Sequence, residues 1–246
     1  MTIDGFFWLA SLAAFLVGLS KGGLPTIGML AVPVLSLVMS PVKAAVLLLP
    51  IYVVSDMVSV WLYRRDFSLP NLKILVPASI VGVLMGWLTA SITSDSAVKF
   101  LIGLMGIGFC FNIWLRRTPQ AIQAVSVKKG IFWGVVTGFT SFICHAGAPP
   151  FQIYVLPQRL PKVVFAGTAT FLFTIVNLAK VLPYQQLNPY SEADLLKAAW
   201  LVPSALMGTL IGAYLTRRMA DKWFFRIVQV GLFAISIKLI ADAVWP

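Results

Sequence analysis

Residues 18–26 (GLSKGGLPT) place a lysine among three glycines and a proline, with long apolar sequences on both sides. Glycine and proline interrupt a helix, and an unpaired backbone amide in hydrocarbon costs several kcal/mol. A lysine at the centre of a membrane helix costs about 2.5–3.5 kcal/mol on insertion scales. Because protein or water must surround such a feature, we expect a polar site at mid-membrane depth.

In this site the Lys21 side chain would contact an anion. The backbone amides of Ser20, Gly22 and Gly23 would add donors, and helices that begin after the break would add their positive dipole ends. The competing interpretation is a lysine that extends from a short segment to the membrane surface.

A second break, residues 144–150 (CHAGAPP), has a similar composition. His145 is the only histidine of the chain. Because the reference pKa of histidine is about 6.5, it is a candidate anion donor or proton carrier. Its alternative role is a structural hydrogen bond that closes a broken helix. Gly147 is expected to bring the backbone close to the substrate, and Cys144 to be a small packing residue.

Polar residues within three other apolar runs complete the candidate set. Asp56 lies midway along one run, where carboxylates are rare and by default functional. We expect it to pair with Lys21 or to carry a coupling proton, with a purely structural ion pair as the alternative. Asn177 is a predicted substrate contact. The weaker candidates for cavity-lining residues are Thr26, Gln152, Tyr154 and Lys180.

The composition identifies an integral membrane protein. Of 246 residues, 59% are hydrophobic and 11% charged, whereas soluble domains carry about 25% charged residues. The formal net charge is +11, but the basic residues lie in short loops between apolar runs, which is typical of cytoplasmic loops. We therefore expect no nucleic-acid partner. The charge would instead attract an anionic solute or membrane lipids.

Ten apolar segments follow one another along the chain, and nothing remains for a soluble domain. They are residues 6–19, 26–39, 44–63, 72–92, 97–115, 130–143, 151–157, 164–184, 195–215 and 223–245. This pattern predicts an all-α polytopic membrane protein with eight to ten spans. The segments beside the two breaks are short, so each pair is either two full spans, a re-entrant hairpin or a discontinuous helix.

The segments recur at constant spacing. Gly18 and Pro41 lie 120 residues before Gly138 and Pro161, and the run Leu75-Val76-Pro77 recurs 126 residues later. Gly82 and Gly86 follow the second spacing to Gly208 and Gly212. We predict two homologous repeats, residues 1–119 and 120–246, within a single transmembrane domain. Chance similarity between apolar strings is the alternative.

Five segments per repeat would insert the second repeat upside down. One side of the membrane would then carry Arg64, Arg65, Lys73, Arg116, Arg117, Lys128, Lys129, Arg159, Lys162, Arg217, Arg218 and Lys222. The other side would carry Asp4, Lys43, Asp95, Glu192 and Asp194. The positive-inside rule places both termini outside the cytoplasm, in a bacterial inner membrane. Paired interrupted segments in two repeats are typical of a transporter binding site, and we expect the two breaks to meet there.

These motifs together resemble the TauE/SafE family (TSUP) of sulfite-exporter-like permeases. The resemblance rests on Lys21-Gly22-Gly23-Leu24, Pro50 with Asp56, residues 145–150 (HAGAPP), and Asn177 with Lys180. It covers nearly the whole chain. The resemblance implies transport of small sulfur-containing anions such as sulfite, thiosulfate, sulfonates or sulfoacetate-like compounds.

We therefore predict a secondary-active, ion-coupled anion transporter without cofactor or metal; a homodimer is one allowed assembly. With two cysteines and one histidine, the chain offers neither a disulfide framework nor a multi-histidine metal site. The alternatives are an anion channel, a transporter of a small organic carboxylate, or an assembly partner without transport. An intramembrane enzyme would need a nucleophile–base pair, and the adjacent Cys144 and His145 have poor geometry for one.

Overall fold

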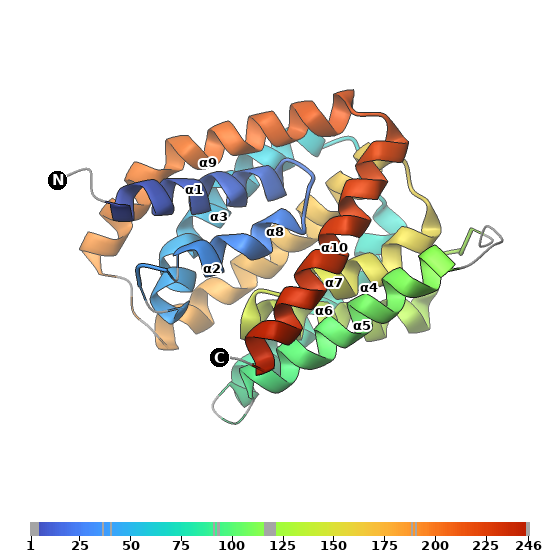
Figure 1. Cartoon of the computed structure of the whole chain (residues 1–246), viewed down its shortest axis with the longest axis horizontal. Coiled ribbons are helices and arrows are strands. Elements are labelled where there is room, and N and C mark those ends of the chain that lie inside the picture. The colour runs from blue at the N-terminus through green and yellow to red at the C-terminus, as the bar shows by residue number, and fades with distance from the viewer. Residues whose placement is uncertain are drawn as a thin grey trace. The chain divides into compact units, whose positions relative to one another are not determined.

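The computed structural model describes residues 5–35, 37–39, 41–90, 92, 94–115, 122–187, 189 and 191–244. Within this part of the chain the regular structure is helical throughout, so the predicted all-α class is confirmed (Figure 1). The elements are α1 (Gly5–Lys21), η1 (Ile27–Leu30), α2 (Ala31–Leu35), α3 (Pro41–Tyr63), α4 (Leu69–Thr89), α5 (Asp95–Leu115), α6 (Val127–Cys144), α7 (Ala148–Val155), η2 (Leu156–Gln158), α8 (Lys162–Leu187), α9 (Glu192–Arg218) and α10 (Asp221–Val244).

Within the residues that the structure describes, six helices are long and apolar enough to cross a membrane, namely α3, α4, α5, α8, α9 and α10. The chain is therefore a multi-pass membrane protein. The four other helices flank the two breaks: α1 and α2 have 17 and 5 residues, and α6 and α7 have 18 and 8. The sequence allowed eight to ten spans, and the difference from six lies in these two interrupted pairs.

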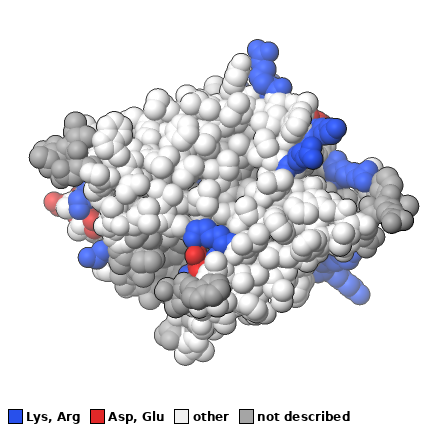
Figure 2. All heavy atoms as spheres, viewed as in Figure 1, with Lys and Arg blue, Asp and Glu red and all other residues white. Residues whose placement is uncertain are grey.

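Lipid-facing surface is abundant. Figure 2 shows a face on which charged side chains are few and most of the visible surface is uncharged. Large apolar side chains are exposed on the long helices, for example Leu88 at 77% and Leu182 at 66%. A soluble protein rarely exposes contiguous apolar area on this scale, so contact with lipid explains it.

The chain forms two compact units that do not coincide with the predicted repeats. The first unit consists of Met1–Phe67 and Ala166–Met219, and the second of Ser68–Phe165 and Ala220–Pro246. The first unit thus holds α1, α2, α3, α9 and most of α8, and the second holds α4–α7 and α10. Each unit takes helices from both halves of the sequence.

In the first unit α1 packs along α9, and Figure 1 shows these helices side by side. Glycines allow this close approach: a Cβ on Gly18 would overlap the carbonyl oxygen of Ala205, and one on Gly208 would overlap that of Phe15. Small residues at helix interfaces let backbones pack closely in membranes. This contact fixes the C-terminal end of α1, where the first break begins.

The second unit repeats the same contact between α6 and α4. A Cβ on Gly138 would overlap the carbonyl oxygen of Ser79, and one on Gly82 would overlap that of Val135. These residues are related to the α1–α9 contacts by the offsets of 120 and 126 found in the sequence. The correspondence supports the division into two repeats, which we keep as a proposal.

Candidate functional site

The first break begins where α1 ends at Lys21. The Gly22 amide donates to the Gly18 carbonyl at 2.8 Å, and the Gly23 amide donates to the Ser20 carbonyl at 3.3 Å. Gly23 has a φ of 120°, which side chains rarely adopt. The chain then turns into η1. The break is therefore a defined turn, which requires glycine at position 23.

Two hydroxyl groups hold the carbonyl of Gly22. Tyr63 of α3 donates to it at 2.5 Å, and Thr216 of α9 donates at 3.1 Å. Both residues are fully buried. Carbonyls at a helix end lack intrahelical donors, so these two hydroxyls satisfy one that would otherwise be unpaired. A third hydroxyl, on Thr170 of α8, donates to the Lys21 carbonyl at 3.4 Å. Three helices thus anchor the break.

Lys21 forms a buried ion pair with Asp56. Its Nζ lies 2.6 Å from Asp56 Oδ1, and the two side chains are only 6% and 2% exposed. The other carboxylate oxygen accepts from Asn177 Nδ2 at 2.8 Å. The ammonium also lies 5.1 Å from the ring centroid of Tyr52, within cation–π range. Three residues predicted from the sequence therefore come together, one each from α1, α3 and α8.

A buried ion pair is by itself weak evidence of a stabilising role. Removing one member of a buried pair typically costs about 3–5 kcal/mol, whereas replacing both by apolar residues is often neutral or stabilising. Such a pair inside a membrane protein points to binding or ion coupling.

The interior of the first unit also carries a surplus of positive charge. The buried charged residues that the structure describes are Lys21, Asp56 and Lys180, that is, two lysines against one aspartate. Lys180 follows Asn177 by three residues on α8 and is 1% exposed. Its side chain is therefore buried within the first unit. An interior with one surplus cation suits a negatively charged solute.

The remaining candidates of the first break are engaged within the chain. Ser20 Oγ donates to the Val17 carbonyl at 2.8 Å. Thr26 is 3% exposed, and its carbonyl accepts from the Met29 amide at 3.2 Å. In this conformation the amides of Gly22 and Gly23 are also occupied. Their contact with an anion stays a prediction, and it requires the break to rearrange.

The second break, in the second unit, is closed by Thr140. Its carbonyl accepts from the Ala146 amide at 3.1 Å. Its hydroxyl lies 3.0 Å from the Ala146 carbonyl and 2.8 Å from the Val136 carbonyl, and either can accept its proton. Between Thr140 and Ala146, His145 adopts a left-handed conformation with φ 53° and is half-buried. Gly147 is buried and caps the start of α7. The Cys144 side chain, expected to be a packing residue, lies outside the part that the structure describes.

Gln152 on α7 is the most conspicuous polar residue of the second unit. It is 0% exposed, and neither atom of its carboxamide has a hydrogen-bond partner among the described residues. The buried hydroxyl of Thr137 on α6 also has no hydrogen-bond partner among the described residues. An amide buried without a partner costs several kcal/mol, so such a group implies water or a ligand. Tyr154, in contrast, donates its hydroxyl to the Ser126 carbonyl at 3.2 Å.

Sequence reasoning missed the hydroxyl groups that shape both breaks. Tyr63, Thr216, Thr170 and Thr140 hold the backbone, and none was a candidate. Threonine and tyrosine are common in apolar helices, so their presence alone does not indicate a role. Only their spacing relative to the break could have identified them as residues that hold its backbone. Thr140, for example, lies four residues before the break at residue 144.

These features define a multi-pass helical membrane protein with two interrupted helix pairs and buried charged residues at one interruption. The chain matches the model of the sulfite exporter TauE/SafE family over residues 10–239 and belongs to that family. It is thus a membrane permease of the sulfite-exporter type, and the resemblance in the sequence is confirmed. No curated protein and no solved structure matches the chain.

Proposed function

We propose that the chain is a secondary-active permease that carries a small sulfur-containing anion, such as sulfite, thiosulfate, a sulfonate or sulfoacetate, together with protons. The observation that carries the proposal is the buried Lys21–Asp56 ion pair, with Asn177 bound to the same carboxylate. Membership of the sulfite exporter family supports the substrate class. Lys21 binds the anion, Asp56 carries the coupling proton, and Asn177 positions Asp56.

Charge balance links the anion to the proton. Lys21 and Asp56 together carry no net charge, so an anion reaches the lysine by displacing the carboxylate. A carboxylate buried without a counter-charge is far costlier ionised than neutral, so the displaced Asp56 takes up a proton. The site then holds one ammonium, one monoanion and a neutral acid, and is again uncharged. A divalent anion needs a second proton or a second cation, for which Lys180 is the candidate.

Further contacts are proposed at the second break. His145 and the backbone at Gly147 would donate to the anion. The Gln152 carboxamide would donate a hydrogen bond to a substrate oxygen. The unpartnered state of Gln152 among the described residues supports this role. We propose the bacterial inner membrane as the location and place both termini outside the cytoplasm.

Transport in proteoliposomes tests this function. With a pH gradient imposed, we expect sulfite or a sulfonate to accumulate above its equilibrium concentration. The control variant carries Lys238→Gln with Asp242→Asn, because this i,i+4 pair on α10 has the same charges but is about a third exposed. Flux that only dissipates the anion's own electrochemical gradient would contradict coupling and favour an anion channel.

Asp56→Asn separates coupling from binding. Asparagine resembles the protonated acid, so we expect the variant to retain anion exchange across the membrane and to lose accumulation driven by the pH gradient. Asp56→Asn combined with Lys21→Gln removes both charges and should fold without binding the anion. Accumulation that survives in Asp56→Asn would remove Asp56 from the coupling mechanism.

Thermal stabilisation of the purified protein tests the substrate class. Sulfite, thiosulfate, methanesulfonate, sulfoacetate and acetate are compared, and we expect the sulfur anions to raise the unfolding temperature more than acetate. Lys21→Ala should lose this stabilisation. Equal stabilisation of the variant would contradict the role of Lys21, and a stronger effect of acetate would favour a carboxylate transporter.

A further inference from the structure

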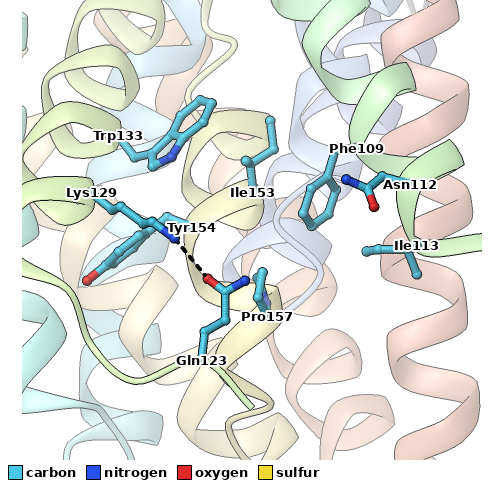
Figure 3. Close-up of a pocket in the computed structure, with 9 residues that line it drawn as sticks. All are labelled: Phe109, Asn112, Ile113, Gln123, Lys129, Trp133, Ile153, Tyr154 and Pro157. Atoms are coloured by element: carbon cyan, nitrogen blue, oxygen red, sulfur yellow. Dashed lines mark hydrogen bonds between the residues drawn. The ribbon is translucent and has the colours of Figure 1, made fainter. Parts of the chain in front are cut away.

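A pocket in the second unit is lined by none of the residues of the two breaks, 18–26 and 144–150. Its volume is about 250 Å³, and helices α5, α6 and α7 line it (Figure 3). Lys129 and Trp133 come from α6, Asn112 comes from α5, and Gln123 comes from the segment that precedes α6. In Figure 3 the Lys129 side chain extends to Gln123 across one end of this space. None of these residues takes part in the proposed transport.

The lining of the pocket is partly polar and partly apolar. Lys129, Gln123 and Asn112 offer an ammonium and two carboxamides, and Trp133 offers an indole. Phe109, Ile153 and Pro157 supply apolar walls. A ligand that fits both kinds of surface has a charged head and a hydrocarbon part, because apolar walls gain nothing from a fully hydrated ion.

The cation of the pocket lacks a counter-charge. Lys129 Nζ contacts Gln123 Oε1 at a long 3.5 Å. No carboxylate of the described residues lies within ion-pair distance of it, since the ion pairs there involve Lys21, Lys162, Arg217 and Lys238. The residue is exposed and lines the pocket, so its side chain is available to a negatively charged group.

The pocket lies at one end of the spanning helices. Asn112 stands near the end of the α5 span, which runs from Ser96 to Leu115, and Lys129 is the third residue of α6. Arg116 and Arg117 follow α5 in the sequence, and Lys128 is the second residue of α6. Such basic loops face the cytoplasm, where the membrane leaflet holds anionic lipids and basic pockets bind their head groups.

We propose that this pocket binds the head group of an anionic phospholipid from the cytoplasmic leaflet. The phosphate lies at Lys129 and the Trp133 indole, and the start of an acyl chain lies along Phe109 and Ile153. A volume of 250 Å³ is below the roughly 300–1,000 Å³ of pockets that enclose whole ligands. The pocket therefore encloses the head group and the start of one acyl chain, while the rest of both acyl chains stays in the bilayer.

Lipid titration of the full-length purified protein tests this site. Binding of phosphatidylglycerol and phosphatidylcholine is compared by native mass spectrometry in detergent. We expect phosphatidylglycerol to bind about fivefold more tightly, the ratio that one lysine near an anionic surface provides. Lys129→Gln should remove this preference. The matched control is Lys128→Gln, because Lys128 is also exposed on the first turn of α6 but does not line the pocket.

Each contrary outcome overturns a part of the proposal. Equal binding of the two lipids, or equal losses in the Lys128 and Lys129 variants, would replace a defined site by diffuse attraction. Glycerol phosphate without acyl chains serves as the soluble probe, and displacement of phosphatidylglycerol by it at similar concentration would show a soluble-anion site instead. Ile153→Trp fills the pocket without changing its charge and should also abolish the preference; a preserved preference would place the lipid elsewhere.

Discussion

Gly23 is the glycine of the first break whose backbone conformation disfavours a side chain. It has a φ of 120°, and a Cβ there would lie 2.6 Å from Thr216 Oγ1 and 2.8 Å from the Tyr63 hydroxyl. Those hydroxyls hold the Gly22 carbonyl, so a side chain would disturb the support of Lys21 as well as the turn. We predict that Gly23→Ala destabilises the protein by more than about 1 kcal/mol and lowers transport.

The control for this variant is Gly108→Ala, because nothing lies within 4 Å of a Cβ at Gly108. Alanine favours a helix over glycine by about 0.8–1.0 kcal/mol, so this control should be neutral or slightly stabilising. Chemical unfolding in detergent measures both variants. Equal stability of the Gly23 variant and the wild type would mean that the turn adapts to a side chain.

Gln152 allows a prediction in which stability and function change in opposite directions. Its carboxamide is buried without a described partner, and an apolar side chain of similar size removes that cost. We predict that Gln152→Leu leaves the unfolding temperature unchanged or raises it, while anion stabilisation falls. Thr137→Val is the companion variant, since its hydroxyl is equally unpartnered. A clear loss of stability in Gln152→Leu would show that the carboxamide serves the fold.

The helices α1 and α6 occupy equivalent environments, each packed by glycine against one long helix. Gly208 of α9 meets the Phe15 carbonyl, and Gly82 of α4 meets the Val135 carbonyl. A methyl group at either position forces the helix pair apart, which typically costs about 1–3 kcal/mol. We predict that Gly208→Ala and Gly82→Ala lower stability by similar amounts, as measured by unfolding in detergent. Strongly unequal losses would argue against two equivalent repeats.

At the scale of elements, the sequence predicted which segments exist but not how they group. The apolar runs and the two glycine- and proline-rich breaks stand out because hydrocarbon penalises charge and broken helices. All six long helices were therefore predictable. The composition of the compact units could not be predicted, because each unit contains helices from both predicted repeats, 1–119 and 120–246. Such grouping depends on close glycine contacts across residues far apart in sequence.

The same contrast applies to the candidate site. Lys21, Asp56 and Asn177 were predictable because polar side chains are rare within apolar runs. Pairing of Lys21 with Asp56 was one of the alternatives, and the structure contains it. The hydroxyl contacts to Gly22 could not be predicted, because they depend on how α3 and α9 pack beside the break.

At the scale of the whole molecule, the distribution of charge leads to a prediction of topology. Arg64 and Arg65 follow α3, and Arg217 and Arg218 end α9. Arginines beside spanning helices stay in the cytoplasm. Two repeats with the same number of crossings give an even total, which returns the C-terminus to the side of the N-terminus. We predict that alkaline phosphatase fused after the C-terminal residue is active in bacterial cells, whereas green fluorescent protein at the same position is dark.

A fusion after Arg65 serves as the internal control, because it should show the opposite pair of signals. Replacing Arg217 and Arg218 with glutamine should weaken the preference, since positive charges within 15–20 residues of a span determine orientation. A bright fluorescent fusion at the C-terminus would place that end in the cytoplasm. The pocket at Lys129 would then face the other leaflet, where the anionic lipid proposed for it is scarcer, so the two experiments constrain each other.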